Sequence, residues 1–245
     1  MHSFDDQTIR FHSFHWDNYS LDMLTAHKRV MQHLGLKVEY TCKNIPHGQW
    51  LDEVFAQNSA QVVAIIEPDL FPLNREIVQR CLDYVLKEDT FVGIAQASNH
   101  IHPMAHIYAA PAFFLMTKSC YERLGRPSFT KYWRGDVGQR ISYLAERKGV
   151  AYRTLYPTCF EREPQGGAWR LGSYGYYGIG TVFGDAVYHL YQGRVAENVQ
   201  LFIQRADELI SGRFNYAGFR SATAIPYTGK FVVNEQKWYK KIIRW

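Results

Sequence analysis

The chain is 245 residues long, 47% of its residues are hydrophobic, and its formal net charge is +5 at pH 7. A chain of this length and apolar content can bury a sizeable core, as one α/β domain or as two halves that share a sheet. The mild positive charge fits anionic small molecules, a phosphate-rich polymer or a membrane surface, and it selects none of them. No segment approaches the ~18 to 20 apolar residues of a membrane span, so no transmembrane segment is expected.

The cysteines and the N-terminal residues indicate a reducing compartment. The chain has no CxxC pair and no close Cys/His group of the zinc type, and we expect its cysteines to be reduced and buried. Its first residues include acids where a signal peptide would carry basic residues before an apolar run. We therefore expect a cytoplasmic protein. The cysteines are Cys42, Cys81, Cys120 and Cys159.

Strands and helices alternate along the first part of the chain. Apolar patterns predict strands at 9–14, 37–41, 62–66 and 91–97, and a further apolar segment at 109–117. Helical spacing predicts helices at 21–34, 50–56, 74–86, 118–124, 136–148 and 197–211. Ser20 suits the N-cap of the first helix and Gly35 suits its end. Such alternation is typical of βαβ units with a parallel sheet, and no repeat or linker marks a domain boundary.

Two carboxylates separated by one proline follow the most apolar of these strands. Residues 62–66, VVAII, suit a central strand that is buried on both faces. Glu67 and Asp69 come directly after it, and Pro68 stiffens the turn between them. Ligands of open α/β sheets bind beyond the carboxyl ends of the strands, where such acids can meet a divalent cation and a phosphate. The alternative is an ordinary turn in which Asp69 caps the following segment.

The segment 166–184, GGAWRLGSYGYYGIGTVFG, is rich in glycine and aromatic residues. Glycine permits tight turns, and loops carry many binding residues. We interpret this segment as a mobile or tightly turned loop whose rings are placed to lie on a ligand.

Taken in order, these segments resemble the GT-A glycosyltransferases, most strongly at IIEPDLFPL, AAPAFFLMTKSCYERLG and GTVFGDAVYHLYQGR. The likeness covers roughly residues 8–195. It implies an α/β, GT-A-like (Rossmann-type) fold with a mostly parallel central sheet flanked by helices. It further implies a single domain over 1–245, with a nucleotide-sugar half at about 1–98, an acceptor half at about 99–195, and a C-terminal helix and tail at 196–245. The implied activity is sugar transfer from a UDP- or GDP-sugar, aided by Mn²⁺ or Mg²⁺.

The resemblance also implies which residues bind the metal ion. Asp69 matches the last acid of the family's DxD-type pair, and His189 of AVYHLYQGR matches a late histidine ligand. Glu67 stands where the first Asp of the pair is usual, which leaves contact with ribose, or with the metal through water, as its role. An imidazole in an oxygen-rich site suits Mn²⁺ better than Ca²⁺. The alternative for His189 is a buried, hydrogen-bonded core histidine.

Two further residues match positions of chemical importance. Asp136 in RGDVGQR matches the catalytic base of inverting members, which takes the proton of the acceptor hydroxyl. The alternative is that Asp136 only caps a helix. Arg194 follows His189 closely and is a candidate to clamp the diphosphate as it leaves, or else to pair with an acid on the surface.

The donor is expected to contact two loops. The loop HWDNYS matches the place where the family binds the nucleotide base and ribose, which makes Trp16, Asp17 and Tyr19 candidates for stacking and ribose contact. In SNHIHPMAH we assign Asn99 and His100 to the sugar or acceptor pocket. The histidines of this segment, His102 and His106 included, are also spaced as a second metal site could be, an interpretation that we rank lower.

The end of the chain, 229–245, interleaves basic residues with Trp238, Tyr239 and Trp245. Such a segment can bind a phosphate backbone and stack on bases, rest on a lipid surface, or simply be solvated. The acceptor therefore stays open between a glycan, a lipid-linked glycan and a modified base in DNA. The competing hypothesis is a non-catalytic binding module of the same fold. A nucleotidyltransferase ranks last because HSFHWDNYS has neither Gly nor Lys for a phosphate loop.

Overall fold

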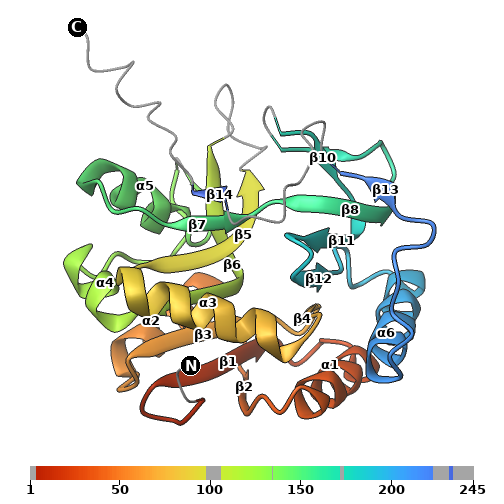
Figure 1. The fold of residues 1–245 in the computed structure, drawn as a ribbon, viewed down its shortest axis with the longest axis horizontal. Coiled ribbons are helices and arrows are strands. Elements are labelled where there is room, and N and C mark those ends of the chain that lie inside the picture. Colours follow the sequence, from red (N-terminus) through yellow and green to blue (C-terminus); the bar gives the residue numbers. More distant parts are fainter. Residues whose placement is uncertain (1–3, 98–105, 134, 172–173, 223–231, 234–245) are drawn as a thin grey trace, which may run out of the picture.

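The computed structural model describes residues 4–97, 106–133, 135–171, 174–222 and 232–233. Its larger sheet has seven strands in the order β14-β7-β5-β6-β3-β1-β2 (Figure 1). Strands β1, β2, β3, β5 and β7 run in one direction, whereas β6 and β14 run in the other. The strands are β1 (Ile9–His15), β2 (Val38–Cys42), β3 (Val62–Ile66), β5 (Phe91–Ala97), β6 (Ile107–Thr117), β7 (Arg153–Leu155) and β14 (Val232–Val233).

Helices cover both faces of this sheet. Helices α1 and α3 pack on one face and α2, α4 and α5 on the other, because their apolar side chains belong to two different buried clusters. Helix α6 packs against α1 instead. All of β3 is buried, and its successive residues alternate between those clusters. The helices are α1 (Leu21–His33), α2 (His47–Gln57), α3 (Arg75–Glu88), α4 (Lys118–Arg123), α5 (Gln139–Lys148) and α6 (Ala196–Ile210).

This is the architecture that the resemblance implies: a GT-A-like α/β fold with a mostly parallel central sheet flanked by helices. Local signals explain why several helices begin where predicted. The Ser20 side chain accepts a hydrogen bond from the Met23 amide at the start of α1, and Asn74 does the same for Ile77 at the start of α3. At the end of α1, Gly35 adopts a φ of 65°.

A second, five-stranded sheet in the order β13-β8-β11-β12-β4 was not predicted. All of its pairs are antiparallel. It takes up residues 179–183 of the segment 166–184, so this part is a strand and not a mobile segment. Gly166, Gly167 and Gly175 have positive φ, as the expected tight turns require. The remaining strands are β4 (Leu70–Pro72), β8 (Pro157–Arg162), β9 (Trp169–Arg170), β10 (Tyr176–Tyr177), β11 (Ile179–Phe183), β12 (Val187–His189) and β13 (Arg220–Ser221), of which β9 and β10 pair with each other.

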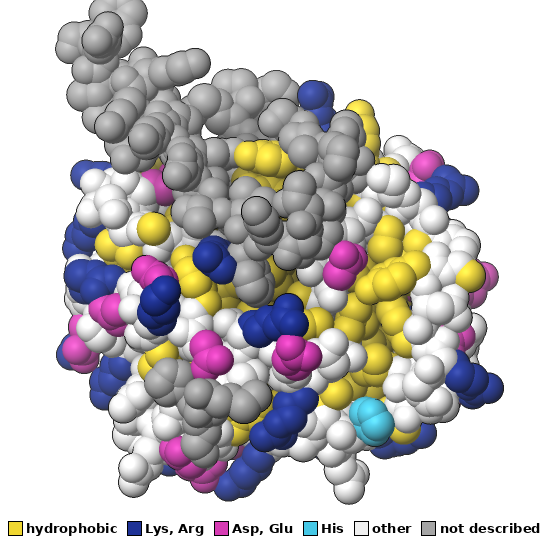
Figure 2. All heavy atoms as spheres, in the orientation of Figure 1, with side chains coloured by type: hydrophobic (Ala, Val, Ile, Leu, Met, Phe, Trp, Pro, Cys, Tyr) yellow, Lys and Arg dark blue, Asp and Glu magenta, His cyan; other side chains and the backbone are white. Residues whose placement is uncertain are grey.

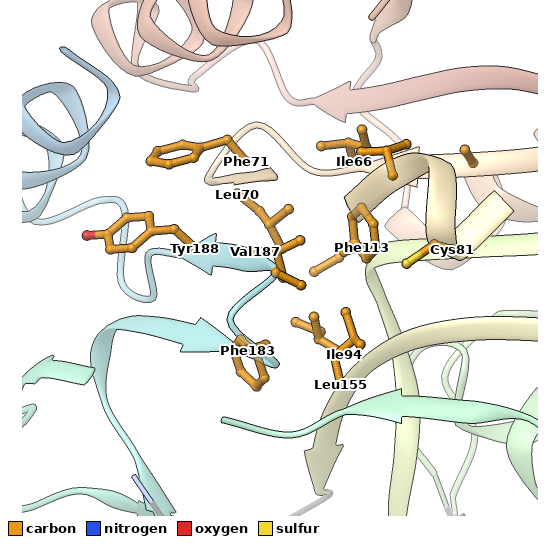
Figure 3. Close-up of a cluster of buried hydrophobic side chains, with 14 of the residues drawn as sticks. Ile66, Leu70, Phe71, Cys81, Ile94, Phe113, Leu155, Phe183, Val187 and Tyr188 are labelled. Carbon is orange, nitrogen blue, oxygen red and sulfur yellow. The ribbon is translucent and has the colours of Figure 1, made fainter. Parts of the chain in front are cut away.

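The two sheets share a hydrophobic core. Leu70 and Val187 of the smaller sheet belong to the same buried cluster as Ile66 and Phe113 of the larger one. Figure 3 shows these side chains pointing toward one another across the space between the sheets. The packing of one sheet on the other therefore fixes where β4 and β12 lie relative to the end of β3.

Two other expectations need correction. Helix α5 begins at Gln139 and not at residue 136, because Gly138 has a φ of 76° and breaks the helical backbone just before it. The cysteines are all free, but only Cys81 and Cys120 are buried, whereas Cys42 is exposed. Cys42 lies at the end of β2, an edge strand, and is therefore more open to solvent.

Within the described ranges, no helix combines the length and the apolar character that crossing a bilayer requires. On the face shown in Figure 2, the described basic and acidic side chains are interspersed and form no continuous basic stripe. The expectations for Asn99, His100, His102 and the tail at 234–245 lie outside the described residues.

Candidate functional site

The two acids lie on a tight turn that ends β3. The Glu67 amide donates to the Ala112 carbonyl of β6 over 2.8 Å, and the Leu70 amide donates to the Glu67 carbonyl over 3.1 Å. This closes a four-residue turn with Pro68 at its second position, where the fixed φ of proline is favoured. The turn carries the chain from the large sheet into β4 of the small sheet, and it holds both acids beyond the carboxyl end of β3.

His189 reaches this turn through the pairing of β12 with β4. In that ladder His189 is opposite Leu70, and the Leu190 amide donates to the Asp69 carbonyl over 2.8 Å. The His189 Nε2 atom lies 3.6 Å from Asp69 Oδ1. Glu67, Asp69 and His189 each offer one donor atom, and these atoms all lie within 4.8 Å of one another. Residues that are far apart in the sequence therefore form one cluster.

The cluster is set into the protein rather than on its surface. The side chains of His189, Glu67 and Asp69 are 7%, 22% and 25% exposed, respectively. Burial, followed by the nearby charge of Asp69, raises the pKa of Glu67 well above its ordinary value. The buried atoms Asp69 Oδ1 and His189 Nδ1 have no hydrogen-bond partner. Two carboxylates and an imidazole that lie this close together, with buried ligand atoms that have no hydrogen-bond partner, fit a divalent cation such as Mn²⁺.

His47, the first residue of α2, adjoins the cluster and was missed by the sequence interpretation. Its Nε2 atom lies 3.2 Å from Glu67 Oε1, although the two atoms are not in hydrogen-bond geometry. The ring stacks against Phe14 and Trp50. Burial lowers the pKa of His47 to about 4, against the opposing charge of Asp69. His47 thus places a neutral imidazole beside the acids.

Tyrosine side chains lie around the same acids. Burial raises the pKa values of Tyr19, Tyr108 and Tyr191, and the charge of Glu67 raises all of them further. The hydroxyls of Tyr19 and Tyr191 are buried without a hydrogen-bond partner. The ring of Tyr191 lies 4.1 Å, centroid to centroid, from that of His189. Only Tyr19 had been singled out from the sequence; its neighbours lie in apolar segments that resemble ordinary core.

Asp136 lies in the turn before α5. Burial raises the pKa of the Tyr108 hydroxyl, and the charges of Asp136 and Glu67 raise it further. Asp136 Oδ1 accepts a hydrogen bond from the Val137 amide over 2.9 Å. The N-cap position of α5 belongs to Gly138. Asp136 is therefore not the N-cap residue itself, although its carboxylate accepts an amide hydrogen bond in the turn just before the helix.

The structure connects the other candidates less closely with the cluster. The Trp16 indole donates to the Ile45 carbonyl over 3.0 Å, and Asp17 accepts from the Asn44 side chain over 2.6 Å. Arg194 is exposed in the turn after β12 and forms no ion pair with any other described residue.

Among the described residues, neither His106 nor a surface pocket beside α6 belongs to the acidic cluster. His106 is buried, and its Nε2 is 2.8 Å from Glu146 Oε1, so this histidine is engaged elsewhere. The pocket contains none of the cluster residues. It is lined by Gln200, Ile203, Gln204, Asp207, Glu208, Arg213 and Asn215.

No protein-family model matches the sequence, and neither does any curated protein. Several solved structures align with it at low similarity. CMP:2-keto-3-deoxy-manno-octonic acid synthetase, solved with CTP, aligns over 61% of this chain and 89% of its own, at 11% identity and a TM-score of 0.39. TarS from S. aureus aligns over 56% of this chain and 33% of its own, at 9% identity and a TM-score of 0.37.

A third solved structure is a glycosyltransferase involved in the glycosylation of the major capsid of PBCV-1. It aligns over 47% of this chain and 62% of its own, at 10% identity and a TM-score of 0.33. Likenesses at this level carry no argument about activity. The fold assignment rests on the strand order and strand directions of this chain.

Proposed function

We propose that this protein is a metal-dependent glycosyltransferase that moves a sugar from a nucleoside-diphosphate sugar, such as a UDP- or GDP-sugar, to a hydroxyl acceptor. The observation that carries the proposal is the clustering of Glu67, Asp69 and His189 at the carboxyl end of β3. Backbone hydrogen bonds of the turn and of the β4–β12 ladder hold the residues of this cluster next to one another.

Asp69 and His189 are the proposed ligands of Mn²⁺ or Mg²⁺, with Glu67 acting on the ion through water or on the donor ribose. The unpartnered Asp69 Oδ1 supports this assignment, since a buried carboxylate oxygen without a donor is costly. When bound, such an ion neutralises the charge that develops on a departing diphosphate. Arg194, in the turn after His189, is the proposed further positive charge for that leaving group.

Asp136 is the proposed general base. In the transfer step the acceptor oxygen forms a bond to C1 of the sugar while the bond from C1 to the diphosphate oxygen breaks. The Asp136 carboxylate takes the proton of the acceptor hydroxyl, and the nucleoside diphosphate leaves with the electron pair. The position of Asp136 in the turn before α5, where the Val137 amide holds its carboxylate, supports this assignment.

The binding of the donor nucleotide is assigned to Trp16, Asp17 and Tyr19, and the sugar or acceptor pocket to Asn99 and His100. Of these, Tyr19 has the strongest support, because its buried hydroxyl lies near both acids. The acceptor is proposed to be a glycan, a lipid-linked glycan or a modified DNA base. The basic tail is the proposed contact for a membrane surface or for nucleic acid.

The test is release of nucleoside diphosphate from a panel of UDP- and GDP-sugars, with Mn²⁺, with Mg²⁺ and with EDTA. We expect release from at least one donor in the presence of metal ion and its loss with EDTA. A chain that binds a donor tightly but releases no diphosphate under any condition would be a binding module, and the proposal would be wrong.

A further inference from the structure

A series of hydrogen-bonded, buried polar side chains leads from Tyr152 to the backbone of Asp136. At its far end, Tyr152 donates its hydroxyl hydrogen to Glu146 Oε1 over 2.7 Å. His106 Nε2 lies 2.8 Å from the same oxygen. His106 Nδ1 lies 3.2 Å from Gln139 Nε2, and Gln139 Oε1 accepts the Asp136 amide over 2.9 Å.

The chemistry of these groups allows only one direction of hydrogen-bond donation along this series. His106 Nε2 faces the Glu146 carboxylate oxygen and donates to it, which leaves His106 Nδ1 as an acceptor. The Gln139 amide nitrogen donates to that Nδ1 atom. Its carbonyl oxygen is thereby turned toward Asp136, whose backbone N–H can only donate. Each group thus fixes the orientation of the next.

Burial makes this arrangement rigid. The side chains of His106 and Glu146 are 6% and 5% exposed, and Gln139 and Tyr152 are buried as well. A buried polar group that loses its partner pays the full cost of desolvation, and so a turned Gln139 amide is disfavoured. The backbone at Gly138 adds a second restraint, because it packs closely against Pro111 of β6. A Cβ at position 138 would lie only 3.1 Å from the Pro111 side chain.

From this geometry we infer that Gln139 and His106 are positioning residues that hold Asp136 for proton transfer. The inference rests on the proposed role of Asp136 as the base. The Gln139 carbonyl fixes the Asp136 backbone, and the Val137 amide fixes the Asp136 carboxylate. The distance between a base and its proton must be held within fractions of an ångström, because small displacements cost large factors in rate.

The test compares substitutions at the two ends of this hydrogen-bonded series. Gln139→Met removes the group that binds Asp136 but keeps the side-chain length, whereas Gln139→Glu keeps an oxygen for the Asp136 amide. Tyr152→Phe is the matched control, since it removes a hydrogen bond at the end remote from Asp136. Asp136→Asn reports on the base itself.

Two readouts separate positioning from general stability. In the full chain without ligand, hydrogen exchange of the Asp136 amide is expected to speed up in Gln139→Met and to stay unchanged in Tyr152→Phe. With the donor found in the panel assay, Gln139→Met is expected to lower kcat by about 10- to 100-fold. KM for the donor and the affinity for nucleoside diphosphate with Mn²⁺ are expected to stay unchanged, and Gln139→Glu is expected to restore most of kcat.

The outcomes that overturn the inference differ from those that overturn the base. If Asp136→Asn is inactive but Gln139→Met loses no more kcat than Tyr152→Phe, the positioning role is wrong and the base stands. Unchanged exchange of the Asp136 amide in Gln139→Met overturns the positioning role without any donor. If Asp136→Asn keeps the wild-type kcat, the base assignment fails, and the positioning role fails with it.

Discussion

His27 shows how far the interior near the acidic cluster excludes charge. It lies in the middle of α1, is completely buried, and has its Nδ1 atom 2.9 Å from the Tyr40 hydroxyl. Burial lowers the pKa of His27 from its ordinary value of 6.5 to about 3, although the charge of Asp69 opposes this shift. The folded protein therefore keeps His27 neutral at pH values where the unfolded chain protonates it.

Stability is expected to fall as the pH is lowered from 6.5 toward 3, because only the unfolded state then takes up a proton at His27. Between pH 7.5 and pH 5, protonation of His27 in the unfolded state lowers the free energy of unfolding by about 2 kcal/mol. Urea unfolding at pH 7.5 and pH 5 measures the loss, and His27→Phe is expected to lose less than the wild type by that amount. His33→Gln, at an exposed position of the same helix, should not alter the loss. Equal losses in His27→Phe and the wild type would contradict the account.

The site residues that the sequence predicts lie next to an apolar strand or within a motif of the resembled family. Glu67 and Asp69 follow an apolar strand directly, and the resemblance supplied His189. His47 and Tyr108 carried no such signal, because the former begins a helix and the latter lies in an apolar strand. Their positions result from the packing of α2 and from the place of β6 between β3 and β5 in the large sheet. No local sequence pattern predicts such contacts between distant segments.

Strand β11 depends on one glycine for its fit to the rest of the small sheet. Gly180 has a φ of 67°, and a Cβ there would lie 2.6 Å from Glu161 Oε1 and 2.9 Å from the Tyr188 hydroxyl. Glu161 is mostly buried and accepts hydrogen bonds from Arg205 and Tyr188. A side chain at this position would therefore strain the backbone and also displace a buried ion pair.

Gly180→Ala is expected to lower the unfolding free energy by about 3 kcal/mol, since a left-handed backbone and a disturbed buried pair both contribute. Gly149→Ala is the matched control: Gly149 has a φ of 69°, but a Cβ there would have no neighbouring atom within 4 Å. That substitution should cost only the backbone term, about 1 kcal/mol. Denaturant unfolding of both variants decides the matter, and equal losses would mean that the close approach to Glu161 is unimportant.

Elements with strong local signals were predicted well, whereas the small sheet was not predicted. Helices α1 and α3 have side-chain caps and a clear apolar face, and β3 and β5 are continuous apolar runs. The small sheet is built from short strands, such as β4 and β12, whose partners are distant in the sequence. Glycines in β11 and its neighbours resemble loop signals, although Gly180 in fact serves a close contact within the sheet.

The junction between the two sheets explains why the acids and His189 meet. The chain leaves the large sheet at Ile66, turns through the acids, and enters the small sheet at Leu70. The shared core in Figure 3 keeps both sheets in one arrangement. A metal ion at this junction would be held by groups from both sheets, and its binding would therefore depend on the folded state.

Diffraction from crystals soaked with Mn²⁺ and UDP, with anomalous data collected for manganese, locates the ion without any assumption about activity. The account predicts a single strong peak between the Asp69 carboxylate and His189 Nε2, and its loss in crystals of Asp69→Asn. Manganese bound away from these side chains, or a peak that persists unchanged in Asp69→Asn, would contradict it.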